Sequence, residues 1–229
     1  MEEFRITRQQ LCSMIDHTNL KPYAVREDFE KLCREARENN FAMVAINPAP
    51  VRLCRELLAG SGVHVGAAVS FPLGQDTLAA KIFCAEDAVK NGADEIDYVL
   101  NIGELKAGNW DYIEKEMREM TSLCKSFNVI LKVIFEICYL TGEEIKMAAG
   151  MAKKVGPDYI KTSTGLGCSG ADAHIVRIMK EASGEDVKVK AAGGIRDWQT
   201  CREMLMAGAC RIGTSSSLKI LEEFEMENK

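Results

Sequence analysis

Two kinds of segment alternate along the chain. Short runs of β-branched and other apolar residues recur at intervals of roughly 20 to 35 residues, the pattern of strands separated by helices. Eight such runs predict eight strands. They are Met14–His17, Phe41–Ile46, Val63–Val69, Glu95–Leu100, Val129–Phe135, Tyr159–Lys161, Val187–Ala191 and Cys210–Gly213.

The segments between these runs carry apolar residues at positions i, i+3 and i+4, which predicts amphipathic helices. Thr141 and Glu144 have the spacing of a capping box, and Gly156 follows the end of the same predicted helix. The clearest helical segments are Val25–Asn39, Thr77–Asn91, Trp110–Phe127, Glu143–Val155 and Asp197–Ala207.

A strand followed by a helix, repeated along the chain, is typical of a parallel sheet. Eight such units in 229 residues fit a closed barrel better than an open doubly wound sheet, which usually has fewer strands. No linker rich in Pro, Gly or Ser divides the chain. We therefore predict an α/β fold, a (β/α)8 TIM barrel, as a single domain over residues 1–229. A short helix before Met14 is expected to cover the barrel floor.

Composition narrows the class of protein. Apolar residues make up 47% of the chain and charged residues 28%, as in soluble globular proteins. The formal net charge is -5 and no basic stripe is present, so we expect no nucleic-acid partner. The first residues are charged, and no apolar window reaches the length of a membrane span, which predicts a cytoplasmic protein without a membrane partner.

The residues that commonly bind metals lack the required spacing. None of the nine cysteines forms a Cys-x-x-Cys pair, and most occupy apolar helix positions, where a reduced cysteine acts as a small hydrophobic residue. His17, His64 and His174 also lack metal spacing, and His64 is expected to be a satisfied packing residue. We expect no metal and no cofactor.

In barrels of this type the reacting groups lie at the carboxyl ends of the strands. Lys132 is the single charge in the fifth predicted strand, with apolar neighbours on both sides. Lys161 and Lys190 end consecutive strands, so their ammonium groups should lie close together. A neighbouring cation lowers the pKa of an amine, as an amine nucleophile requires. The polar candidates at this end are Asp16, Asn47, Asp97, Lys132, Lys161 and Lys190.

Each of these lysines, taken alone, could instead be a solvated residue that pairs with an acid. Glu95 and Lys188 lie nearer the amino ends of their strands. We expect those two to face solvent or to pair with each other, without a catalytic role.

Several motifs resemble the deoxyribose-phosphate aldolase family in order and spacing over nearly the whole chain. They are Asp16-His-Thr-Asn-Leu, Gly92-Ala-Asp-Glu-Ile-Asp97, Leu131-Lys-Val-Ile, Tyr159-Ile-Lys-Thr-Ser-Thr-Gly165, Val189-Lys190 with Ala192-Gly-Gly-Ile-Arg196, and Gly213-Thr-Ser-Ser216. The Lys-Thr-Ser-Thr-Gly and Lys-x-x-Gly-Gly-Ile-Arg motifs are specific in combination. The resemblance implies reversible aldol cleavage of 2-deoxy-D-ribose 5-phosphate to D-glyceraldehyde 3-phosphate and acetaldehyde through a Schiff base.

The same resemblance implies residue roles. Lys161 would form the Schiff base, Lys190 would lower its pKa, and Asp97 would move protons, often through a water. Asp16 would hold Lys190 and relay protons with it, and Lys132 would support Asp97. Thr18 and Asn47 would line the substrate pocket with hydrogen-bonding groups.

Two further pairs point to a phosphorylated sugar substrate. Gly193-Gly194 and Ser215-Ser216 follow the last two strands, where such barrels bind phosphate. Glycine permits close backbone approach, and serine hydroxyls join the N–H groups of a helix N-terminus around an anion. Either pair alone could be a tight turn or a helix cap.

Thr164 and Gly165 are expected to line the same site. The run Gly165–Gly170 also matches the dinucleotide pattern G-x-G-x-x-G. The strand before it ends in polar residues, and the next strand ends at Lys190, where a dinucleotide site needs an acid. A turn that faces a phosphate is the favoured interpretation.

Two positions depart from relatives of this family. Leu166 stands where many of them carry an aromatic or basic residue, and no tyrosine follows Tyr159, so we expect proton transfer without a C-terminal tyrosine. The alternatives are a Schiff-base aldolase with a different donor and a sugar-phosphate-binding barrel without turnover. A homodimer and a homotetramer are both compatible with the sequence.

Overall fold

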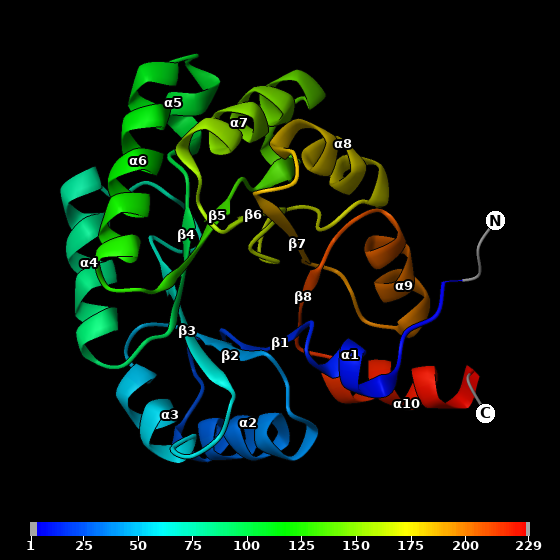
Figure 1. Ribbon diagram of the computed structural model, residues 1–229. Coiled ribbons are helices and arrows are strands. Elements are labelled where there is room, and N and C mark those ends of the chain that lie inside the picture. Colours follow the sequence, from blue (N-terminus) through cyan, green and yellow to red (C-terminus); the bar gives the residue numbers. More distant parts are fainter. Residues whose placement is uncertain (1–3, 228–229) are drawn as a thin grey trace.

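The computed structural model describes residues 4–227 and has eight parallel strands in a closed barrel, with each strand paired to its neighbours in chain order (Figure 1). This arrangement confirms the predicted (β/α)8 fold. The strands are β1 (Ile15–Asn19), β2 (Met43–Ile46), β3 (His64–Val69), β4 (Glu95–Val99), β5 (Ile130–Ile134), β6 (Tyr159–Lys161), β7 (Lys188–Ala192) and β8 (Arg211–Thr214). Each lies within one or two residues of the expected boundaries.

The helices form a ring outside the barrel (Figure 1). The five segments that the sequence predicts most clearly are helical: α2 (Arg26–Asn39), α4 (Leu78–Lys90), α6 (Trp110–Ser126), α7 (Gly142–Val155) and α9 (Trp198–Met206). The ring also contains α3 (Val51–Leu57), α8 (Ala173–Ser183) and α10 (Ser217–Glu227). Two short helices were not predicted, α5 (Ile102–Lys106) and the 3-10 helix η1 (Ile137–Tyr139). Among residues 4–227 no helix is long and apolar enough to span a bilayer.

The predicted N-terminal helix is α1 (Arg8–Cys12), and it lies at the amino-terminal end of the barrel. Leu11 is fully buried there. Arg8 donates to Asn39 at the end of α2, 2.6 Å away, and to Glu225 near the end of α10, also 2.6 Å away. Helix α1 therefore ties the carboxyl ends of two helices together below β1. The predicted domain of residues 1–229 extends at both ends beyond the described residues.

The hydrophobic core lies between the sheet and the helices. Outward-facing strand residues such as Val44, Ile96 and Val133 are fully buried against the helical ring. Small residues on the inward face of the strands leave room for longer neighbours. A Cβ on Gly66 would lie 2.2 Å from Met43 Sδ, and a Cβ on Gly213 would lie 3.1 Å from Lys190 Cε. The interior therefore keeps its space for long side chains such as Met43 and Lys190.

A first prediction concerns the capping box of α7. Thr141 Oγ1 accepts from the Glu144 N–H at 3.3 Å, and the Glu144 carboxylate accepts from the Thr141 N–H at 2.7 Å. Thr141→Ala should lower the free energy of unfolding by about 1 kcal/mol, because the first turn of the helix loses an acceptor. Urea denaturation measures this loss. Thr141→Ser keeps the acceptor and is the control, and an equal loss in both variants would contradict the capping explanation.

Candidate active site

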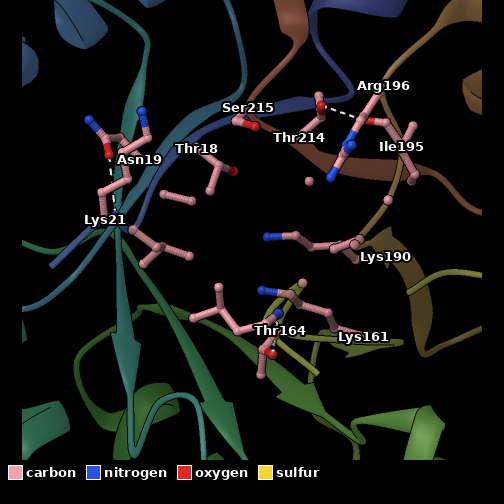
Figure 2. A pocket seen from close by; sticks show the side chains of 18 of the residues that line it. Thr18, Asn19, Lys21, Lys161, Thr164, Lys190, Ile195, Arg196, Thr214 and Ser215 are labelled. Carbon is pink, nitrogen blue, oxygen red and sulfur yellow. Dashed lines mark hydrogen bonds between the residues drawn. The ribbon is translucent and has the colours of Figure 1, made fainter. Parts of the chain in front are cut away.

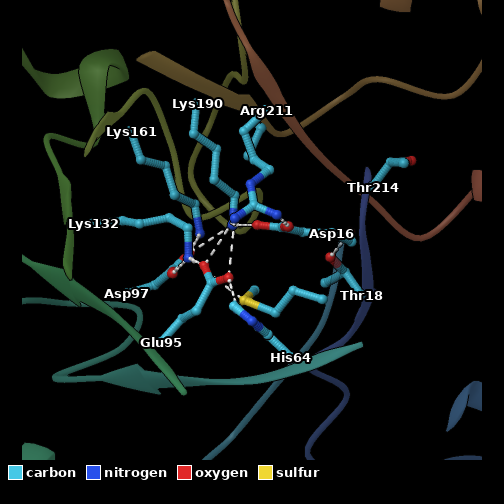
Figure 3. Close-up of polar contacts among 12 residues, drawn as sticks. Asp16, Thr18, His64, Glu95, Asp97, Lys132, Lys161, Lys190, Arg211 and Thr214 are labelled. Carbon is cyan, nitrogen blue, oxygen red and sulfur yellow. Dashed lines mark hydrogen bonds and ion pairs between the residues drawn. The ribbon is translucent and has the colours of Figure 1, made fainter. Parts of the chain in front are cut away.

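Strand register brings the predicted charged residues together inside the barrel (Figure 3). Asp97 pairs in register with Lys132, and Lys161 pairs with Lys190. Side chains of one parity on neighbouring parallel strands point the same way. The adjacency of Lys161 and Lys190 expected from the sequence is therefore confirmed. Lys190 lies in the middle of β7 rather than at its end.

Asp97 is the centre of this cluster. Its Oδ2 accepts hydrogen bonds from Lys161 Nζ at 2.8 Å and from Lys190 Nζ at 2.7 Å, and its Oδ1 accepts from Lys132 Nζ at 2.8 Å. Burial alone would raise the pKa of Asp97, but the three ammonium groups hold it well below its usual range. Asp97 is therefore an ionised carboxylate.

Two more carboxylates complete the network. Asp16 forms ion pairs with Lys190 at 2.5 Å and with Arg211 at 3.2 Å. Glu95 contacts Lys132 and forms an ion pair with Arg211 at 3.0 Å. Both carboxylates are fully buried.

The prediction that Glu95 faces solvent or pairs with Lys188 is wrong. Glu95 points to the barrel axis, where Lys132 and Arg211 lower its pKa against the opposing effect of burial. Lys188 is the exposed residue of that pair. His64 is half-exposed and its Nδ1 lies 2.7 Å from Glu95 Oε1, so it is a satisfied side chain, as expected.

The cluster carries more cations than anions. The cations are Lys132, Lys161, Lys190 and Arg211, and the carboxylates are Asp16, Glu95 and Asp97. Of these three carboxylates, Lys132, Lys190 and Arg211 each contact two, whereas Lys161 contacts one, Asp97. Loss of a proton from Lys161 therefore removes the least compensated charge.

The electrostatics of Lys161 agree with this count. Its side chain is 5% exposed, and burial lowers its pKa to about 8. Asp97 opposes the shift, while the neighbouring Lys190 and Lys132 cations add to it. A buried amine that loses its proton near neutral pH is suited to nucleophilic attack on a carbonyl group.

A cavity of about 400 Å³ opens above the two lysines at the carboxyl ends of the strands (Figure 2). Six of the predicted binding residues line it, namely Thr18, Thr164, Gly165, Gly193, Gly194 and Ser215. Lys161 and Lys190 reach it from below, while Asp16, Asp97 and Lys132 lie deeper in the barrel.

Asn47 and Ser216 do not line this cavity. Asn47 Nδ2 donates to the carbonyl of Leu20 at 3.4 Å, so it supports a lining residue from behind. The Ser216 N–H donates to Thr214 Oγ1 at 2.9 Å, one residue beyond the wall of the cavity.

The glycine run Gly165–Gly170 packs loops together. Gly170 meets Gly193 so closely that a Cβ on Gly170 would lie 2.2 Å from the Gly193 carbonyl oxygen. The Ala171 N–H donates to the same oxygen at 2.9 Å. Gly165 and Gly193 both have positive φ, 85° and 90°. These glycines join the loop after β6 to the loop after β7, and this packing accounts for their spacing.

Three cations near the site were not among the predicted site residues. Arg211, the first residue of β8, is buried, and its position in a predicted strand of inward parity was the available signal. Arg196 and Lys21 are exposed cations that line the cavity. Figure 2 shows the Arg196 guanidinium pointing over the cavity.

Glu136 was also missed. It follows β5 with a left-handed backbone (φ 54°) and is almost fully buried. Its carboxylate accepts from the Thr164 N–H at 3.3 Å and from the Thr164 hydroxyl. Burial raises the pKa of Glu136, and the bonds from Thr164 oppose that shift. Glu136 thus holds the loop that follows Lys161.

Comparison with known proteins gives a consistent result. The model of the DeoC/LacD family of aldolases matches residues 11–223. A deoxyribose-phosphate aldolase of Bacteroides thetaiotaomicron is 52% identical over 217 residues, which cover 95% of this chain and 91% of the relative. The enzyme of that name from Lactobacillus acidophilus is 50% identical over 225 residues, with 98% and 95% covered.

Solved structures agree with this match. The tetrameric deoxyribose phosphate aldolase from Aeropyrum pernix superposes with a TM-score of 0.88 at 32% identity, covering 96% of this chain and 92% of that one. A Schiff-base-forming fructose-1,6-bisphosphate aldolase, 18% identical, shares the fold with a TM-score of 0.63 and coverage of 96% and 99%.

The electrostatics of the cluster yield a second prediction. Lys190→Leu should raise the pKa of Lys161 by at least about one unit, because a neighbouring cation is lost and Asp97 is left with one fewer partner. The neutral amine is the reactive form, so its reactivity should then rise at higher pH. The rate at which acetic anhydride modifies Lys161, followed across pH by peptide mass mapping, measures the shift.

Lys190→Arg keeps the positive charge and is the matched control. An unchanged midpoint in Lys190→Leu with only a lower plateau would show that Lys190 does not tune Lys161 electrostatically.

Proposed function

The chain belongs to the DeoC/LacD family of aldolases, and from this premise we propose that it cleaves 2-deoxy-D-ribose 5-phosphate reversibly to D-glyceraldehyde 3-phosphate and acetaldehyde, with Lys161 forming the Schiff base. The observation that carries the assignment of Lys161 is its environment. It is the lysine of the cluster with a single carboxylate partner, and it faces the cavity with its pKa lowered to about 8.

Cleavage begins when the neutral Lys161 amine attacks C1 of the open-chain sugar. Loss of water from the carbinolamine gives an iminium ion, which accepts an electron pair from the neighbouring bond. The C3 hydroxyl then loses its proton, the C2–C3 bond breaks, and glyceraldehyde 3-phosphate leaves. The remaining enamine takes a proton at C2, and water releases acetaldehyde and Lys161.

Asp97 is the group best placed to move these protons. It is ionised and lies 2.8 Å from the Lys161 nitrogen. A water between Asp97 and the C3 oxygen would let it accept the proton in cleavage and return it in synthesis. Lys190 and Lys132 occupy the remaining sites on this carboxylate and keep it ionised.

Asp16 and Thr18 have supporting roles in this mechanism. Asp16 holds Lys190 from the side opposite Asp97, with a separation of 2.5 Å. Thr18 lines the cavity and donates its own hydroxyl to the Asp16 carbonyl at 2.9 Å, so its oxygen can still accept from a substrate hydroxyl.

We place the substrate phosphate at the end of the cavity that the loops after β7 and β8 form. Gly193, Gly194 and Ser215 line that end, and Arg196 supplies an exposed cation above it. Helix α10 begins two residues after Ser215 and has no acidic residue in its first turn. The N–H groups of a helix N-terminus attract an anion, which supports this placement.

We also propose that the whole chain, residues 1–229, forms one domain, acts in the cytoplasm without a cofactor, and assembles as a homodimer or a homotetramer. The tetrameric relative from Aeropyrum pernix supports the second assembly. Among the described residues no cluster of His, Cys, Asp and Glu has the arrangement of a metal site.

The third prediction tests the reaction class and the nucleophile together. Borohydride added with acetaldehyde should inactivate the enzyme by reducing the iminium ion to a stable ethyl group, and peptide mapping should find that group on Lys161. EDTA in excess should leave the activity unchanged. Activity that EDTA abolishes and zinc restores would contradict the Schiff-base mechanism.

The fourth prediction tests the phosphate placement. Ser215→Asp should reduce kcat/KM for D-glyceraldehyde 3-phosphate at least about tenfold more than for free glyceraldehyde, since it places a like charge beside the dianion. Ser216→Asp should have the same selectivity with a smaller effect, because Ser216 lies outside the cavity wall. Equal losses on both acceptors in the Ser215 variant would place the phosphate elsewhere.

A further inference from the structure

His17 lies on the outer face of β1, one residue after Asp16 and on the opposite side of the sheet. It is 4% exposed and packs 5.2 Å from the Phe41 ring. Its Nε2 lies 2.9 Å from Glu35 Oε2 on α2, and its Nδ1 lies 2.8 Å from Ser217 Oγ on α10. One buried imidazole therefore joins a barrel strand to two helices.

This Ser-His-Glu arrangement is not a hydrolytic site. Ser217 has no exposed surface, so no substrate can reach its oxygen. The acid also faces Nε2 and the serine faces Nδ1, the reverse of a serine-hydrolase triad. The network instead has a structural role, since it links β1 to α2 and α10.

The direction of the hydrogen bonds follows from the charges around the ring. Glu35 accepts a hydrogen bond from the Nε2–H group, which leaves Nδ1 of the neutral ring as an acceptor for the Ser217 hydroxyl. Burial lowers the pKa of His17 and favours that neutral form, although Glu35 opposes the shift and Lys31, 3.8 Å from Glu35, adds to it slightly.

Ser217 transmits this contact to the end of the cavity where we place the phosphate. It is the first residue of α10, and it follows Ser215 and Ser216 directly. Thr214 begins the same turn, donates its hydroxyl to the Ile195 carbonyl at 2.7 Å, and accepts from the Ser216 N–H at 2.9 Å. The turn is thus fixed on one side by the loop after β7 and on the other by His17.

We propose that His17 is a positioning residue of the phosphate subsite, which holds the N-terminus of α10 against β1 through Ser217 so that the turn Thr214–Ser217 is ready to receive the substrate phosphate. The inference rests on the phosphate placement proposed above. His17 does not touch the substrate. Because His17 already fixes the turn, less conformational entropy is lost when the phosphate binds.

The test compares two amide variants that each keep one half of the imidazole. His17→Asn places an acceptor at the position of Nδ1 and retains the bond from Ser217, whereas His17→Gln reaches the position of Nε2 and retains the bond to Glu35. Ser217→Ala removes the same link from the other side, together with the longer contact of 3.4 Å between the Ser217 hydroxyl and the Thr214 carbonyl. All three are assayed in the synthetic direction with acetaldehyde and either D-glyceraldehyde 3-phosphate or free glyceraldehyde.

His17→Gln and Ser217→Ala should raise KM for the phosphorylated acceptor about tenfold, the effect of one lost hydrogen bond. Their kcat values and their KM for free glyceraldehyde should stay within about twofold of the wild type. His17→Asn should keep a KM within about twofold for both acceptors. The rate of borohydride trapping on Lys161 should be unchanged in every variant.

Equal losses on both acceptors, or equal behaviour of His17→Asn and His17→Gln, would overturn the proposal. Ser217→Ala deletes only an oxygen and decides the question if a His17 variant fails to fold. Ser215→Asp separates a failure of this inference from a failure of the phosphate placement. Equal losses on both acceptors in Ser215→Asp would refute the placement. A selective loss in Ser215→Asp together with unselective His17 variants would refute only the role of His17.

Discussion

Asp97 Oδ2 receives hydrogen bonds from two lysines at once, and the chemistry of the site depends on that shared oxygen. Burying three lysines and an arginine is costly unless each charge is compensated. Lys132, Lys190 and Arg211 each have two carboxylate partners, whereas Lys161 has one, so the positive charge of Lys161 is the least compensated. The network therefore selects one lysine from three chemically identical ones as the one that loses its proton.

A polar interior of this kind is compatible with stability because the fold buries its apolar surface elsewhere. The outward faces of the strands pack against the helices and form the hydrophobic core. Glycine and alanine occupy inward-facing positions next to the long side chains. The Tyr159 ring contacts two of the cations, with Arg211 5.5 Å and Lys132 5.9 Å from its centroid. Cation–π contacts add to the compensation of these two charges.

The sequence predicted the parts of this structure that depend on periodicity and strand order. Strand parity placed Lys132 inside the barrel, and consecutive order placed Lys161 beside Lys190, because neighbouring parallel strands in a barrel follow the chain. Glu95 was misassigned because its position at the amino end of β4 suggested exposure to solvent, and only the three-dimensional structure shows its ion pair with Arg211 of β8. Arg211 itself could have been found from the parity of β8. Glu136 and His17 depend on side-chain contacts across loops and helices, which no local pattern encodes.

The two ends of the cavity belong to one connected set of loops. The loop after Lys161 contains Gly165 and Gly170, which pack directly on Gly193, and Glu136 fixes the same loop through Thr164. Gly193 and Gly194 in turn precede Ile195, whose carbonyl binds Thr214 in the turn before α10. A small displacement at the proposed phosphate end would therefore shift the backbone that follows the proposed nucleophile. Because the reacting atoms must be held within a fraction of an ångström, glycines at these contacts serve alignment as much as turn geometry.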